Sequence, residues 1–124
     1  MALCQHKGEK IMEDCIFCKI DKGVIPSPKV YEDEYFFIIK DIEPKAKQHY
    51  LAIPHKHFKL LKDMDAQGAE ALAHIFETLP KLVAKLGLDG GYRLIINQGD
   101  DAGQTVPHLH IHILGGQNLE WNPA

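Results

Sequence analysis

The sequence has no long apolar run and no surplus of positive charge. Its 124 residues include 14 Lys and Arg against 17 Asp and Glu, for a net charge of −3 with histidine neutral. Proteins that track a nucleic-acid backbone neutralise many phosphates with Lys and Arg, so nucleic acid is not an expected partner. No apolar run approaches the ~20 residues of a membrane span, and the first seven residues lack the apolar core of a signal peptide. We therefore expect a cytoplasmic protein without a membrane segment.

Cysteine is scarce, and its placement argues against a disulfide framework. The three cysteines are Cys4, Cys15 and Cys18. A bridge between Cys15 and Cys18 would close too short a loop to staple distant segments. The Cys-x-x-Cys pair leaves three readings: a redox dithiol, half of a zinc site, or two buried thiols. The βαβ context of a thioredoxin-like dithiol is absent around it.

The remaining composition is that of one globular domain, with 45% hydrophobic and 25% charged residues. Residues 1–14 are polar and without hydrophobic periodicity, which predicts a flexible N-terminal arm. Residues 15–124 are expected to form a single domain. Their first segment, 16–20, is short and amphipathic and predicts a short helix before the prolines at 26 and 28.

Strand-forming segments and one long helix make up the rest of the chain. Apolar residues recur at three- and four-residue steps from Leu72 to Leu86, which predicts a helix capped by Asp65, ended by Gly87 and disturbed at Pro80. Runs rich in β-branched and aromatic residues predict strands at 30–31, 35–39, 49–53, 92–97 and 108–114. The fold class is therefore α+β, an antiparallel meander sheet with one long helix and a short N-terminal helix.

The last predicted strand carries three histidines in alternation, within His108-Leu109-His110-Ile111-His112. Side chains on a strand alternate between faces, so the three imidazoles share one face at a spacing of about 6.5 to 7 Å, and the aliphatic residues share the other. Neutral imidazoles suit metal binding or nucleophilic and acid–base chemistry. The plainer alternative is a solvated strand with scattered histidines.

A Gly- and Asp-rich loop precedes this strand and contains Gly103-Gln104-Thr105, with Asn97 at the end of the neighbouring strand. Glycines let backbone amides approach one anion, and the side chains add neutral donors. We expect this loop to cradle a phosphate, although by itself it would be no more than a turn. The loop lacks the Gly-Lys-Ser/Thr of a Walker motif.

These features resemble the histidine triad (HIT) superfamily, and its Hint branch in particular. The segment His108–Leu114 matches the His-φ-His-φ-His-φ-φ signature, φ being apolar, without a departure. The similarity extends over about residues 15 to 122 and implies a HIT-like fold. It is carried further by Cys15–Ile20, Tyr31–Glu34, Asp41-Ile42, His49–Pro54, Gly91–Leu94, Gly103–Thr105 and Gly115-Gly116.

The resemblance implies an enzyme that attacks the α-phosphate of purine (adenosine) nucleotide conjugates, as a phosphoramidase does, and releases AMP. It makes His110 the nucleophile that forms a nucleotidyl-histidine. It places His112 on the phosphate oxygens and Thr105 near the leaving group. The remaining implied nucleotide contacts are Asn97, Gly103 and Gln104 for the phosphate, Asp41 for the ribose, and Ile42, Phe17 and Ile20 for the base.

The resemblance also supplies two further ligands that would complete a zinc site with the cysteine pair. Several HIT proteins with this Cys-x-x-Cys carry a structural zinc, and the corresponding residues here are Cys15, Cys18, His49 and His108. No catalytic metal is expected. A homodimer is implied by the family alone, with Trp121 a candidate for shaping the neighbouring subunit's pocket. No role is assigned to Cys4, His6, His55, His57 or His74.

Three other functions stay open at this point. The chain could be a nucleotide-binding scaffold with incidental turnover, or a dinucleoside polyphosphate hydrolase. It could also be a metallohydrolase, because two histidines at i and i+2 of a strand can share one ion. Missing downstream carboxylate ligands and the Gly-Gln-Thr loop count against the metallohydrolase.

Overall fold

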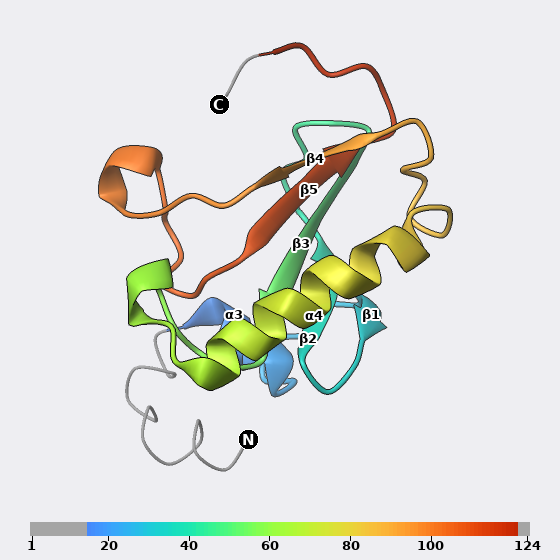
Figure 1. Cartoon of the computed structure of the whole chain (residues 1–124). Helices are drawn as coiled ribbons and strands as arrows, with labels where there is room; N and C mark the ends of the chain where they lie inside the picture. The colour runs from blue at the N-terminus through green and yellow to red at the C-terminus, as the bar shows by residue number, and fades with distance from the viewer. Residues whose placement is uncertain (1–14, 122–124) are drawn as a thin grey trace.

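A computed structural model describes residues 15–121, which form a five-stranded antiparallel sheet with one helix against each face (Figure 1). The expected N-terminal arm of residues 1–14 lies outside the described residues. The strand order is β1-β2-β3-β5-β4, so the meander continues as far as β3, and β5 then lies between β3 and β4. The strands are β1 (Lys29–Glu32), β2 (Phe36–Lys40), β3 (Gln48–Pro54), β4 (Tyr92–Ile95) and β5 (Ile111–Gly115). The α+β prediction is confirmed.

Helix α4 (Ala66–Leu82) covers one face of the sheet. Asp65 caps it as predicted, because its side chain accepts a hydrogen bond from the Gly68 amide at 2.9 Å. Pro80 does not produce the expected irregular turn: it lies inside the helix, which ends two residues later. Gly87 is not the helix end, and instead has a φ of +73° in the turn that follows.

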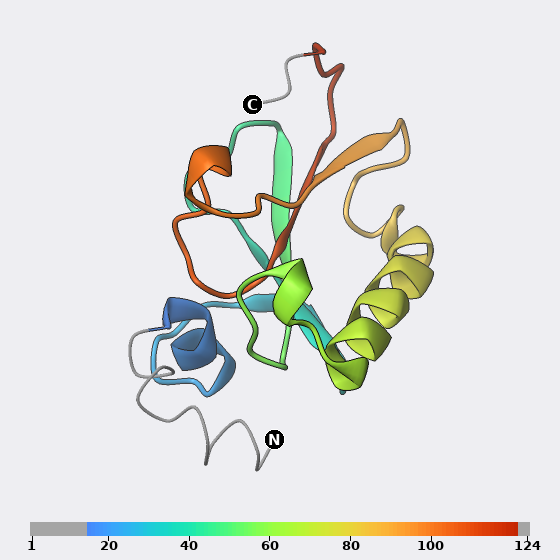
Figure 2. The ribbon, with the colours of Figure 1, turned by 60° about the vertical axis from the view of Figure 1, so that its left-hand side comes forward.

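Helix α3 (Ile16–Asp21) lies on the opposite face, as Figure 2 shows with the sheet between the two helices. It packs on a second apolar cluster, separate from the one beneath α4. This α3-side cluster consists of Cys15, Phe17, Cys18, Ile20, Phe37, Ile39, Leu51 and Ile53. Two 3₁₀ turns, η1 (Leu61–Asp63) and η2 (Asp100–Ala102), lie in the connections. None of the helices within residues 15–121 is long and apolar enough to cross a membrane.

The histidine segment alternates as predicted, but β5 begins at Ile111 rather than at His108. Leu109, Ile111 and Ile113 are fully buried in the core beneath α4. Before Ile111 the backbone leaves the ladder, because the Leu109 amide donates to the Phe58 carbonyl at 2.7 Å, in the loop that follows β3. His108 and His110 are therefore held by the Leu109–Phe58 hydrogen bond between them and by hydrogen bonds of their own side chains.

Candidate functional site

The sheet register gathers the predicted site residues on the face that α3 covers. His112 pairs with Leu51 of β3 and with Ile95 of β4. Asn97 follows the end of β4 by two residues and His110 immediately precedes β5, so both lie just beyond the last paired position, Ile95 with His112. Asp41 directly follows β2, and its amide donates to the His49 carbonyl at 3.0 Å. Residues from three separate segments, Asp41, His49 and His112, thus lie together.

The His110 ring is held in one orientation by its own neighbourhood. Its Nδ1 lies 2.8 Å from the His108 carbonyl oxygen, which can only accept, so Nδ1 carries the proton. The lone pair of the neutral ring is therefore on Nε2. Phe17 packs edge-on against the ring with centroids 5.0 Å apart, and the residue is 8% exposed. Burial lowers the pKa of His110, which favours the neutral, nucleophilic imidazole.

His112 is connected to His49 by hydrogen bonds that fix both tautomers. The Lys45 amide donates to His49 Nδ1 at 3.0 Å, so the proton of neutral His49 is on Nε2. That nitrogen lies 3.0 Å from His112 Nδ1, which must accept. His112 therefore carries its own proton on Nε2 and can donate it to a ligand. Burial, followed by the nearby His110 and His49 rings, lowers the pKa of His112 to about 4, so the ring is neutral near pH 7.

Two thiols and two imidazoles meet at the start of the histidine segment. Cys15 Sγ lies 3.3 Å from His108 Nδ1, and Cys18 Sγ lies 3.2 Å from His57 Nδ1. The two imidazole Nδ1 atoms are 3.1 Å apart. All four ligand atoms lie within 4.8 Å of one another. Two Cys and two His converging in this way are the donor set of a structural zinc site.

The protonation states of this cluster also suit a metal. His108 Nε2 lies 2.8 Å from the Pro54 carbonyl oxygen, so its proton is there and its Nδ1 lone pair faces the thiols. The pKa of the Cys15 thiol is held far below its usual value by hydrogen bonding with Cys18, and His108 and His57 add to this against the effect of burial. Zinc binds the thiolate form, so these residues fit zinc.

The predicted zinc ligand His49 is wrong, and His57 stands in its place. His49 pairs with Leu114, near the end of β5 that is remote from His108. It lies five residues, or about 16 Å along the strand, before Pro54 at the end of β3. Antiparallel pairing brings the end of β3 beside the start of β5, which is where His57 and His108 lie. The His55-x-His57 spacing after Pro54 is the sequence signal for this position, although the sequence alone assigns no role to either histidine.

Hydrogen bonding separates this metal site from the other two clusters of potential ligands. In Asp41/His49/His112, a backbone amide occupies His49 Nδ1, so Nε2 bears a proton where a metal would need a lone pair. This cluster therefore suits proton transfer rather than a metal. That arrangement also weakens the metallohydrolase alternative.

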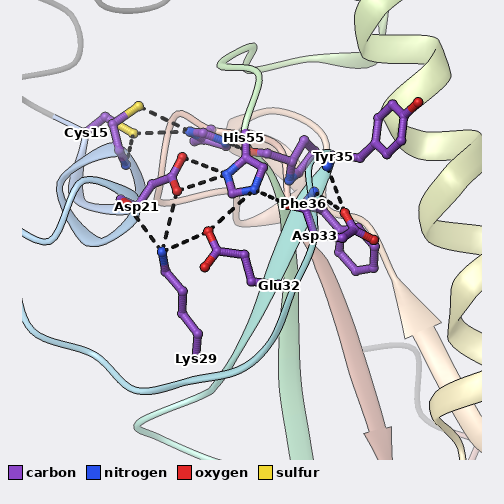
Figure 3. Close-up of polar contacts among 11 residues, drawn as sticks. Cys15, Asp21, Lys29, Glu32, Asp33, Tyr35, Phe36 and His55 are labelled. Carbon is purple, nitrogen blue, oxygen red and sulfur yellow. Dashed lines mark hydrogen bonds and ion pairs between the residues drawn. The ribbon is translucent and has the colours of Figure 1, made fainter. Parts of the chain in front are cut away.

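The third cluster surrounds His55 (Figure 3). His55 Nδ1 lies 2.9 Å from both carboxylate oxygens of Asp21, and Nε2 lies 2.8 Å from the Asp33 carbonyl. Both nitrogens donate, so the ring has no lone pair for a metal. Burial alone would lower the pKa of His55, but the hydrogen bonds to Asp21 and Asp33 raise it. The protonated ring ties α3 to the end of β3.

The predicted phosphate loop is shaped by its own hydrogen bonds. The Gln104 side chain accepts from the Gly99 amide at 2.8 Å and donates to the Lys59 carbonyl at 3.0 Å. The Gly103 and Gln104 amides bond to the carbonyls of Asp100 and Gly99. These two amides therefore do not point at an anion as expected, because closing the turn uses them. Gln104 acts here as a support for the loop, and Thr105 is exposed beside it.

The predicted apolar slot for a base is not enclosed by its three residues. Phe17 is 5% and Ile20 is 7% exposed, both within the α3-side cluster. Ile42, in contrast, is 94% exposed. Phe17 contacts the catalytic candidate His110 directly, a contact that the spacing in the sequence does not reveal.

Metal content distinguishes the two candidate histidine ligands. We expect His57→Gln to weaken zinc binding by at least about 10-fold, because it removes a nitrogen ligand from the site. His49→Gln should leave the zinc content at one ion per chain. Metal analysis of both variants, purified without added zinc, checks this. Equal zinc loss in both, or loss only in His49→Gln, would contradict the assignment.

Comparisons with known proteins agree with this geometry. The HIT domain family matches residues 22–119. An uncharacterized HIT-like protein of Synechococcus elongatus is 43% identical over 90% of this chain and 98% of its own length. The crystal structure of a HIT family hydrolase from Legionella pneumophila superposes with a TM-score of 0.82 at 41% identity, covering 89% of this chain and 99% of that one.

A Zn-bound histidine triad family protein from Mycobacterium smegmatis superposes with a TM-score of 0.74 at 33% identity, covering 89% of this chain and 80% of that one. The HIT fold is thereby confirmed, and the similarity to a hydrolase supports hydrolase activity in general terms. The family match, the close relatives and the histidine segment on a buried sheet face lead to one conclusion: this chain belongs to the HIT domain family.

Proposed function

We propose that the protein is a nucleotidyl hydrolase of the phosphoramidase type, which cleaves purine nucleotide conjugates at the α-phosphate and releases AMP. The observation that carries this proposal is the hydrogen bond of 2.8 Å from His110 Nδ1 to the His108 carbonyl. It leaves a buried, neutral imidazole with its lone pair on Nε2, which is what a nucleophilic histidine requires.

In the first step, His110 Nε2 attacks the α-phosphorus. A bond forms between Nε2 and phosphorus as the bond from phosphorus to the leaving nitrogen breaks. The leaving amine keeps that electron pair and takes up a proton from solvent water. Charge gathers on the phosphate oxygens during this exchange. The Nε2 proton of His112, directed by His49, is placed to stabilise that charge. Thr105 and Asn97 supply further neutral donors near the phosphate and the leaving group.

In the second step, water attacks the nucleotidyl-histidine. The bond between His110 Nε2 and phosphorus breaks and its electron pair returns to Nε2, which restores the neutral imidazole. The mononucleotide leaves with the water oxygen, and a proton of that water is released to solvent. Asp41 is the proposed partner of the ribose hydroxyls, since one carboxylate accepts from two neighbouring hydroxyls. Its other contacts are local: one oxygen accepts from the Glu43 amide at 2.8 Å, and the other lies 3.4 Å from His49.

We assign the proposed zinc to Cys15, Cys18, His57 and His108, where a bound ion cross-links α3 to the sheet. The reaction itself runs through the imidazoles. The resemblance to Hint proteins also implies a homodimer. Trp121, which is 83% exposed and held near Arg93, is the residue that we propose contacts the partner's pocket.

Hydrolysis of adenosine 5′-phosphoramidate with and without a chelator tests this function. We expect release of AMP, with turnover that persists through brief exposure to a chelator that leaves the tightly bound zinc in place. AMP binding without turnover would support a scaffold instead. Turnover that stops at once on chelation, while the protein stays folded with its zinc, would support a metallohydrolase. Much faster hydrolysis of dinucleoside polyphosphates than of the phosphoramidate would support a dinucleoside polyphosphate hydrolase instead.

His49 is expected to act as a positioning residue for His112. His49→Leu removes the donor to His112 Nδ1 and should lower kcat by about 100-fold, the lower end for loss of acid–base assistance. His49→Gln can still accept from the Lys45 amide and donate to His112, so it should retain most of the activity. Steady-state kinetics on both variants measure this. Equal loss of activity in the two variants would contradict the proposal that His49 fixes the tautomer of His112.

A further inference from the structure

Two contacts connect the metal site to the proposed nucleophile. The first runs through His108, whose Nδ1 faces the two thiols while its carbonyl oxygen accepts the Nδ1 proton of His110. One residue thus offers its side chain to a metal and its backbone to the catalytic ring. Any movement of the His108 backbone changes the acceptor that fixes the His110 tautomer.

The second contact runs through Phe17, which lies between the two cysteines on α3. Its ring packs edge-on against both His108 and His110, with centroids 5.9 and 5.0 Å apart. Phe17 therefore covers the nucleophile from the side of the metal site. It keeps this place only while α3 stays against the sheet.

Both elements have little regular backbone structure of their own, although their apolar side chains are buried. Helix α3 has six residues, too few for a stable helix by itself, and its N-cap is the Sγ of Cys15, which accepts from the Cys18 amide at 3.3 Å. Segment 108–110 precedes the β5 ladder. The His55–Asp21 pair holds the end of α3 remote from Cys15, whereas the start of the helix is held by the buried Phe17 and by the contacts of the two thiols.

We propose that the Cys15/Cys18/His57/His108 site positions the nucleophile: with a divalent metal bound, the His108 carbonyl and Phe17 hold the His110 ring in its Nδ1-protonated tautomer. This inference rests on the proposed role of His110, and adds that metal occupancy controls the geometry of the reacting ring. Misplacement of a reacting group by about 1 Å can cost about 100-fold in rate, so loss of this support should lower kcat by a similar factor.

Ring ¹⁵N chemical shifts of His110 test the proposal on the full chain. The spectra are recorded well above the ordinary pKa of imidazole, so that they report tautomer and not charge. Zinc-loaded protein should show one nitrogen with a proton and one without. Metal-free protein should show shifts averaged between the two forms, while the amides of Ile111 and Ile113 keep their folded positions.

Two variants separate positioning from loss of folding. Phe17→Leu keeps all four ligands, and with zinc bound it should still show partial averaging at His110 and a kcat lower by about 10-fold or more. Ile16→Ala, at a 45% exposed position of the same helix, should behave as wild type. If metal removal unfolds the sheet, the His110 ring shifts of zinc-loaded Phe17→Leu test the proposal in the folded protein.

A single Nδ1-protonated tautomer in both the folded metal-free protein and zinc-loaded Phe17→Leu would overturn the proposal. The outcome is independent of the proposed reaction. A protein that shows the tautomer coupling but forms no nucleotidyl-histidine would refute the phosphoramidase function and leave the coupling intact.

Discussion

Replacing His110 by alanine is expected to abolish turnover of adenosine 5′-phosphoramidate, with a loss of about 10⁴-fold or more in kcat, as for removal of other enzymic nucleophiles. The reason is that no second group can take its place: His112 Nδ1 accepts from His49, and its Nε2 carries a proton. Initial rates of AMP release, compared with those of the wild type, measure the effect.

Two further variants make this result specific to the nucleophile. His110→Asn retains a polar side chain of similar size and should be equally inactive while keeping AMP affinity and thermal stability close to wild type. His74→Gln changes a histidine on α4, on the opposite face of the sheet, and should keep full activity. Activity in His110→Asn near that of the wild type would refute covalent catalysis by this ring.

The second large effect is expected from Cys18→Ser, which should leave far less than one zinc per chain and lower the melting temperature by about 10 °C. Zinc that binds the native state and not the unfolded chain adds its binding free energy to stability. A loss of about 3 kcal/mol corresponds to a shift of this size in a domain of this length. Metal analysis and thermal unfolding of the same preparation measure both quantities.

Cys4→Ser is the matched control, because Cys4 is the one cysteine with no assigned ligand role. It should retain one zinc and the wild-type melting temperature. If Cys18→Ser kept its zinc, or lost it with no change in melting temperature, the Cys2His2 site would not be the structural cross-link described here.

The sequence indicated which face of the sheet carries the histidines proposed for the chemistry, because alternation along a strand is a local property. Leu109, Ile111 and Ile113 enter the core, and the three histidines share the other side. The cap at Asp65 was equally local. The start of β5 could not be predicted locally, because it depends on the loop after β3. That loop supplies the Phe58 carbonyl that accepts from the Leu109 amide, so residues 108–110 stay outside the ladder.

The proposed metal ligands show where reasoning from sequence fails. His49 and His57 are both histidines near the β3 segment, and only the pairing of β3 with β5 decides which of them meets His108. Family resemblance selected His49, and the geometry selects His57. Likewise, the Gln104 side chain matched a phosphate contact by motif, yet its amide group bonds to its own loop and to the Lys59 carbonyl.

The protonation pattern could not be predicted from sequence at all. Within residues 15–121, three clusters contain histidine with cysteine or carboxylate partners, and the residue types of each could bind a metal. They differ in what faces the second ring nitrogen: a carbonyl for His108, a backbone amide for His49, and acceptors at both nitrogens for His55. These contacts favour metal binding at the first cluster, proton transfer at the second and an ion pair at the third.

Mass analysis of a trapped intermediate is the most direct test of the account. The protein is mixed with a slowly hydrolysed adenosine phosphorothioamidate, quenched within one turnover, and digested. The account predicts that the peptide containing His110 gains the mass of one thio-AMP group, attached at the imidazole, and that His110→Asn gains none. Rapid product formation with no adduct at any time, or an adduct on His112 in its place, would contradict it.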